Sequence, residues 1–130
     1  MIDMNREINP SSIAPTAANF AHGVLSTDAS RILHISGTVG TRPDGTISDD
    51  IAEQAGETWR SIAAICAEAG LGLDDIVSIT TYAVAGEPLG GVMAARDAAL
   101  GGRRVASVLI TVPALVRPEW RMEVAAVAIR

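Results

Sequence analysis

One carboxylate near the C-terminus lies in an otherwise apolar segment, where it could take part in acid–base chemistry. Glu123 falls in the run Met122–Ile129, whose other residues are all apolar. Alternate residues of a strand face opposite sides, so Glu123 shares one face with alanine, valine and isoleucine side chains. A carboxylate there must be paired, hydrogen-bonded or protonated. It could act as a general acid or base or orient water in a pocket. The alternative is a structural carboxylate paired with Arg121 or another arginine.

Other polar residues could join it. His22 and His34 are of the type that exchanges protons near neutral pH. His34 alternates with strand residues, which favours a hydrogen-bonded core histidine, whereas His22 precedes Gly23 and is the better candidate for a pocket wall. Ser36 and Gly37 together could offer a hydroxyl and a backbone N–H to an anion, although this signal is weak by itself.

The composition disfavours several kinds of site. Cys66 is the single cysteine and falls in an apolar helical stripe, which predicts a buried thiol rather than a nucleophile. The two histidines lack metal-ligand spacing, so we expect no metal. We also expect no organic cofactor. The net charge of −5 and the scattered arginines argue against nucleic acid as a partner. The chain has no apolar run of membrane length and no signal-like start, so we expect a cytoplasmic protein.

Strands and helices must position these residues. Strands are predicted at 20–25, 31–39, 76–84, 105–112 and 120–129, after an irregular lead-in over 1–19. An amphipathic helix follows Ser48, its expected N-cap, and ends near Ala69 before Gly70. A second helix opens at Glu87-Pro88 and ends at Gly101-Gly102. The order β-β-α-β-α-β-β predicts one α+β domain over residues 1–130, in which two helices back a single sheet.

The last strand also predicts an oligomer. Both of its faces are largely apolar, yet two helices can cover only one face of a sheet. The strand over 76–84 repeats this pattern more weakly. A partner subunit is the simplest cover for the second face, because monomers seldom expose large apolar patches.

Three segments together resemble the RidA (YjgF) family: Ile32–Gly37, the helix 50–69 with Gly70–Val77 after it, and Met122–Ile129. The resemblance runs from about Pro10 to Arg130. It implies a chorismate-mutase-like α+β fold with one mixed sheet, and a homotrimer with clefts between subunits. It also implies action on reactive enamines or imines such as 2-aminoacrylate, which water converts to ammonia and a 2-keto acid.

The resemblance assigns roles residue by residue. Glu123 matches the family's catalytic glutamate, and Ser36 matches the serine of its Ser-Gly pair. Phe20 replaces a frequent tyrosine, and Met93 replaces a common asparagine. The expected binding residues are Phe20, His22, Ser36, Gly37, Met93, Ser107 and Leu109.

Ser107 marks the main departure from the family. It stands in the register where deaminating members carry an arginine that binds the substrate carboxylate, and serine cannot supply that pair. Arg103 and Arg104 precede the strand, and Arg121 is a further candidate to compensate. The sequence therefore leaves open an imine- or enamine-directed enzyme and a non-catalytic metabolite-binding trimer. The least supported alternative is the RNA cleavage ascribed to some members, which the acidic charge disfavours.

Overall fold

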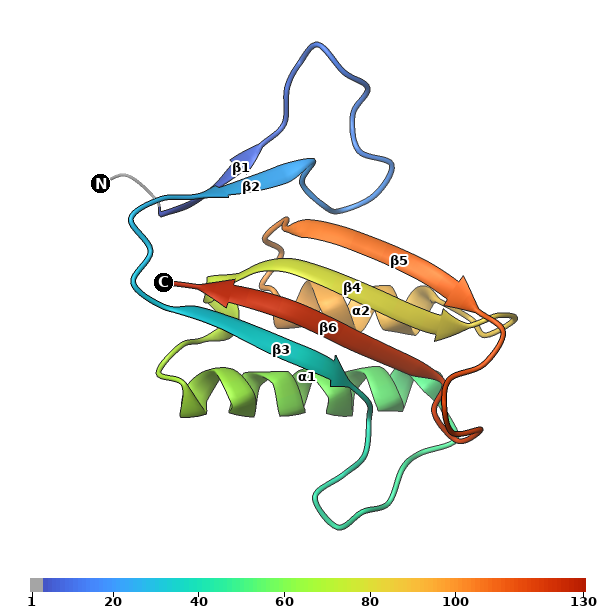
Figure 1. The fold of residues 1–130 in the computed structure, drawn as a ribbon. Coiled ribbons are helices and arrows are strands. Elements are labelled where there is room, and N and C mark those ends of the chain that lie inside the picture. Colours follow the sequence, from blue (N-terminus) through green and yellow to red (C-terminus); the bar gives the residue numbers. More distant parts are fainter. Residues whose placement is uncertain (1–3) are drawn as a thin grey trace.

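Two helices cover one face of a four-stranded sheet, and a separate two-stranded hairpin lies beside it (Figure 1). The computed structural model describes residues 4–130. The elements in chain order are β1 (Asn5–Ile8), β2 (Gly23–Ser26), β3 (Ile32–Thr38), α1 (Ile51–Glu68), a 3₁₀ turn η1 (Leu73–Asp75), β4 (Ile76–Val84), α2 (Gly90–Ala99), β5 (Ala106–Val112) and β6 (Met122–Ile129).

The main sheet is mixed, with strand order β3-β6-β4-β5. β6 runs antiparallel to both β3 and β4, whereas β4 and β5 are parallel and joined by α2. The predicted α+β class with a mixed sheet and two helices is thus confirmed. The expectation of a single sheet is wrong, because β2 pairs with β1 in a separate sheet, and an isolated bridge from Ala21 to Ala106 joins the N-terminal segment to the main sheet.

Local sequence explains both ends of α1. Asp50, rather than the expected Ser48, caps its start, and the Asp50 carboxylate accepts the backbone N–H of Ala52 at 3.2 Å. At the other end Gly70 takes a left-handed φ of 75°. The backbone N–H of Leu71 then donates to the carbonyl of Cys66 at 2.9 Å, as in a Schellman motif.

A close contact joins the two helices. α2 begins at Gly90, two residues after Pro88, and a Cβ added to Gly91 would lie 2.5 Å from the Cβ of Ala52 in α1. Glycine at position 91 therefore lets the helices approach and cover the sheet as one layer.

The core lies between this helix layer and the sheet. It includes Ile51, Ala55, Trp59, Ile62, Cys66, Ile76, Ile79, Val92, Met122, Val124, Ala126 and Ala128. Gln54 is fully buried among them, and its side chain is completely hydrogen-bonded. It donates to the carbonyls of Ser48 (2.7 Å) and Glu119 (2.9 Å) and accepts from the backbone N–H of Arg121 (2.9 Å). Gln54 thereby fixes the turn that leads into β6.

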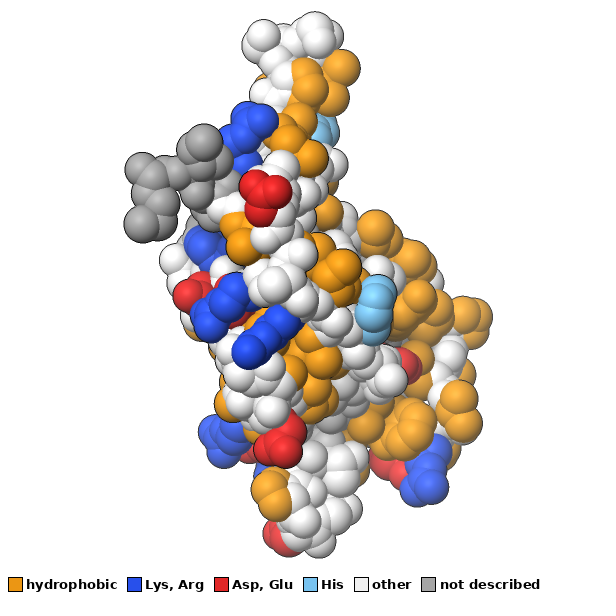
Figure 2. Space-filling model, turned by 60° about the vertical axis from the view of Figure 1, so that its left-hand side comes forward, with side chains coloured by type: hydrophobic (Ala, Val, Ile, Leu, Met, Phe, Trp, Pro, Cys, Tyr) orange, Lys and Arg blue, Asp and Glu red, His pale blue; other side chains and the backbone are white. Residues whose placement is uncertain are grey.

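The opposite face of the sheet is uncovered in the single chain. The predicted alternation along β6 is confirmed, since Met122 is buried whereas Glu123 is half-buried. On β5, Val108 and Ile110 are 49% and 41% exposed on this open face. Hydrophobic side chains gather along the right-hand side of the molecule in Figure 2, where the open face is seen obliquely. The rest of the open face is formed by Ile32, His34, Ser36, Ser78, Thr80, Tyr82, Ala106, Ala125, Val127 and Ile129.

Candidate functional site

Glu123 projects from β6 onto the open face. Its carboxylate makes no hydrogen bond or ion pair with any residue of 4–130. Arg121, the structural partner considered above, instead pairs with Glu87 at 3.5 Å. The structure therefore does not support the alternative of a paired structural carboxylate, and Glu123 remains available to a ligand or to water.

Gly37 makes room for this carboxylate. A Cβ added to Gly37 would overlap Glu123, with the carboxyl carbon only 2.6 Å away. The register of β3 against β6 shifts between Ile35 and Thr38, which brings the backbone of Gly37 against the glutamate. Ser36 lies beside it with an exposed side chain. The structure thus brings together Ser36, Gly37 and Glu123.

Tyr82 is a candidate that sequence reasoning missed. It lies on β4 directly opposite Glu123 in the antiparallel register and is half-buried on the same open face. Its phenolic oxygen has no hydrogen-bond partner among residues 4–130. A phenol donor beside a carboxylate is a combination suited to proton transfer. Strand alternation placed Tyr82 on one face of its strand, but only the register reveals its neighbour.

Three predicted pocket residues lie elsewhere in the chain. Ser107 pairs with the core residue Ile79, and Leu109 pairs with Thr81, so both face the helix layer. Met93 lies with Leu109 at a narrow slot between α2 and the sheet. Within a single chain these three residues therefore do not lie beside Glu123. Ala106, not Ser107, faces the open side at the start of β5.

The two histidines also lie in different parts of the structure. His34 is exposed on the open face and lines a shallow hollow with Ser78, Thr80 and Ala125, so the expectation of a core histidine is wrong. The reason is that the pairing of β3 with β6 puts His34 on the uncovered face. His22 lies in the N-terminal segment with Phe20, which is half-buried and precedes the Ala21 bridge to β5.

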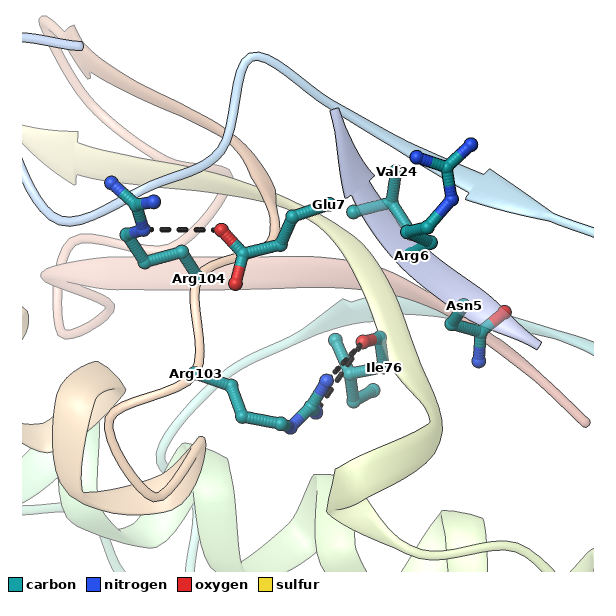
Figure 3. A pocket seen from close by; sticks show the side chains of 7 residues that line it. All are labelled: Asn5, Arg6, Glu7, Val24, Ile76, Arg103 and Arg104. Atoms are coloured by element: carbon teal, nitrogen blue, oxygen red, sulfur yellow. Dashed lines mark hydrogen bonds and ion pairs between the residues drawn. The ribbon is translucent and has the colours of Figure 1, made fainter. Parts of the chain in front are cut away.

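The three arginines considered as replacements are all engaged. Arg103 donates to the carbonyls of Leu73 (2.7 Å) and Ile76 (3.4 Å), which is a structural role. Arg104 binds Glu7 through Nε at 3.1 Å (Figure 3). Arg121 pairs with Glu87, as described above. None of them lies against Glu123 within the chain.

The remaining sequence predictions concern the Cys66 thiol, metal binding and membrane-spanning helices. Cys66 is fully buried as predicted, and burial, followed by the charges of Asp75 and Asp74, raises the pKa of its thiol. Within residues 4–130 no group of three His, Cys, Asp or Glu side chains is arranged to hold a metal ion. No helix in this range is long and apolar enough to cross a membrane.

This architecture is similar to that of known proteins. Residues 11–130 match the family described as Endoribonuclease L-PSP. The crystal structure of YyfB from Yersinia pestis, a Rid-family protein of unknown function, has a TM-score of 0.88 at 29% identity and covers 98% of this chain and 100% of its own. TdcF from E. coli, solved with bound serine, has a TM-score of 0.71 at 21% identity and covers 94% and 93%. The RutC family protein YjgH of Escherichia coli (strain K12) is 37% identical over 51 residues, 39% of each chain.

The mixed sheet with its two-helix layer and the match to YyfB define a protein of the Rid type. The chain belongs to the Endoribonuclease L-PSP family, which includes the YjgF/YER057c/UK114 proteins. The family resemblance found in the sequence is thus confirmed. Identities of 29% and 21% to the two structures mark it as a divergent member.

Proposed function

We propose that this protein hydrolyses or tautomerises imines, enamines or related reactive small molecules, with Glu123 as the acid/base or water-positioning residue. The observation that carries the proposal is the half-buried, unpaired Glu123 carboxylate, seated against Gly37 on an apolar sheet face. A carboxylate in such surroundings is held in one place while its oxygens stay free to exchange a proton.

The proposed site lies in a cleft between the subunits of a homotrimer. The open sheet face supports this assembly, because Val108, Ile110 and the half-buried face of β6 would otherwise remain in contact with water. A neighbouring subunit would also supply the walls that Glu123 lacks within its own chain. Phe20 and His22, which lie away from Glu123 in the N-terminal segment, would line the cleft from the neighbouring subunit. Met93, Ser107 and Leu109 lie between the sheet and the helices and would not line it.

The residues present suffice for hydrolysis of an activated imine. The water oxygen bonds to the imine carbon, the π electrons of the C=N bond pass to nitrogen, and Glu123 accepts the proton of the water. Glu123 then returns that proton to nitrogen, which gives a carbinolamine. In a second transfer Glu123 takes the proton of the carbinol hydroxyl and passes it to nitrogen, so the C–N bond breaks with its electron pair going to nitrogen, the C=O bond forms, and ammonia and a keto compound leave. Tyr82 can donate a hydrogen bond to the developing charge. The reaction needs neither a redox partner nor a metal.

A non-catalytic, metabolite-binding trimer is the second candidate. It is favoured by the start of β5, where Ala106 and Ser107 provide no guanidinium for a substrate carboxylate. A ligand held there would be neutral or apolar rather than an amino-acid-derived anion.

Turnover separates the two candidates. Keto-compound release from freshly generated 2-aminoacrylate and from bulkier and neutral imines should be faster with the wild-type protein than in buffer. Ala106→Arg should improve the use of 2-aminoacrylate, since position 106 faces the open side, whereas Ser107→Arg, directed at the helix layer, should not. No acceleration of any imine by the wild-type protein, together with saturable binding of a neutral metabolite, would favour the binding trimer.

A further inference from the structure

The shallow hollow beside His34 adjoins the candidate site around Glu123. It has a volume of about 180 Å³, and its walls include His34, Ser78, Thr80, Ala125 and Val127. In the antiparallel register Thr80 lies opposite Ala125, and Tyr82 lies opposite Glu123. Successive residues on one face of a strand are about 7 Å apart, so a small molecule can reach both the hollow and the Glu123 carboxylate.

Three polar side chains line this hollow. The hydroxyls of Ser78 and Thr80 come from β4 and the imidazole of His34 comes from β3, on either side of β6. None of the three makes a hydrogen bond or ion pair with another residue of 4–130. A hydroxyl, and an imidazole in its neutral form, can each both donate and accept. Because a covered polar group without a partner is costly, the hollow favours a ligand that supplies donors and acceptors together.

The charges of the sheet narrow the class of ligand further. The strands β3, β4, β5 and β6 contain no lysine or arginine, and Glu123 is their one carboxylate. An anionic group in the hollow would therefore have no counterion on these strands and would be repelled by Glu123. Ala125 and Val127 line the hollow from β6 and offer only apolar contact. Hydroxyl groups on a short, uncharged carbon chain match both the polar and the apolar walls.

We infer that this hollow binds the hydroxylated carbon chain of a neutral ligand, with the hydroxyl groups of the ligand on Ser78, Thr80 and His34. The inference rests on the proposed function in one respect, which is that the other end of the chain carries the carbon attacked at Glu123. Under that function the preferred substrates are imines of short hydroxy ketones or hydroxy aldehydes rather than imino acids. Ser78 and Thr80 are then specificity-determining residues, because they contact the chain and not the reacting C=N bond.

Titration with dihydroxyacetone tests the hollow, with 3-pentanone as the matched probe, because the two ketones differ only in carrying hydroxyl or methyl groups at both ends. Binding to the full-length protein is measured by backbone amide shifts. We expect saturable dihydroxyacetone binding that perturbs the amides of Ser78, Thr80 and Ala125, with 3-pentanone binding much more weakly. Thr80→Val, which replaces a hydroxyl by a methyl group of similar size, should weaken dihydroxyacetone binding roughly three- to tenfold, as expected for one lost hydrogen bond.

Thr111→Val is the matched control for the same change on the neighbouring strand. Thr111 is exposed on β5 and pairs with Ala83, a buried residue of the covered face, so its replacement should leave dihydroxyacetone binding unchanged. Equal binding of the two ketones or wild-type affinity in folded Thr80→Val would overturn the inference. The absence of saturable dihydroxyacetone binding, as when water or a neighbouring subunit fills the hollow, would overturn it too.

Turnover separates this inference from the proposed function. Dihydroxyacetone should inhibit the hydrolysis of a neutral imine competitively, and Thr80→Val should raise the inhibition constant by the same factor as the dissociation constant. Saturable binding in the hollow of a wild-type protein that hydrolyses no imine would support the hollow as a binding site and contradict the proposed activity. Hydrolysis of alkyl imines by a protein that does not bind dihydroxyacetone would support the activity and overturn the inference.

Discussion

The chemistry proposed for this protein depends on one side chain being left unpaired. Arg121, which immediately precedes β6, is the nearest cation in sequence, but it pairs with Glu87 and leaves Glu123 without a counterion among residues 4–130. Gly37 and Tyr82 complete its surroundings from the two neighbouring strands. At the residue scale, the site is a carboxylate that has room because Gly37 carries no side chain, and that lies across the strand pair from Tyr82.

Gly37→Ala should reduce imine turnover while leaving the fold intact. The added methyl group overlaps the flexible end of Glu123 rather than backbone, so the carboxylate should turn away at little cost in stability. Thermal unfolding and initial rates measure the two effects. Gly23→Ala is the matched control on another strand, since its Cβ would meet only the Cβ of Ile8, at 4.0 Å. If Gly37→Ala turns over imines as fast as the wild-type protein, the assigned position of the carboxylate is wrong.

At the scale of elements, α1 positions the strand that carries Glu123. The amide of Gln54 holds the carbonyls of Ser48 and Glu119 and the N–H of Arg121, so it joins the loop before α1 to the turn before β6. Because every polar atom of this buried amide is satisfied, it stabilises the turn without an unpaired group.

Gln54→Leu should destabilise the protein by about 2–4 kcal/mol, because it leaves two carbonyls and one N–H without their partner in a buried place. Chemical denaturation measures the free energy of unfolding, and hydrogen exchange at Arg121 should become faster. Glu68→Leu, at the exposed end of the same helix, serves as the control for an added leucine. Unchanged stability of Gln54→Leu would show that the amide does not anchor β6.

Periodicity predicted the elements better than their pairing. The apolar stripe of α1, the positive φ at Gly70 and the two faces of β6 were all predictable, and with them the placement of Glu123 opposite the helices. The hairpin strand β1 was not, since its short polar sequence gains its β structure from pairing with β2. The register of β4 against β6 was also not predictable from the sequence, because the irregularity between Ile76 and Ser78 sets which side chains of β4 lie opposite those of β6.

The unpredictable pairing of strands also explains the errors made in predicting the candidate site. Ser107 could be aligned to a family position, but the direction of its side chain follows from its pairing with Ile79 on the covered face. Tyr82 was overlooked because its importance comes only from lying across from Glu123. Contacts between strands distant in sequence carried the information that single-strand patterns lacked.

At the scale of the whole molecule, the open sheet face should be the contact surface of the trimer. Ile110→Asp places a charge on this face and should dissociate the trimer with little loss of secondary structure, because a buried unpaired charge is costly in an interface. Sedimentation or light scattering should give three times the 13.5 kDa chain mass for the wild type and less for the variant. Val116→Asp, at a residue 92% exposed in a loop, is the control that should stay trimeric. A monomeric wild-type protein would contradict the proposed assembly.

The central claim is that Glu123 performs the proton transfers of imine hydrolysis. The most direct test compares the initial rates of keto-compound release by the wild-type protein and by Glu123→Gln, at equal concentration and with oligomeric state verified, on the imine that the wild type uses best. Glutamine keeps the size of the side chain but cannot accept the proton, so we predict a rate about 10²–10⁴-fold lower. A Glu123→Gln protein as fast as the wild type would contradict the account.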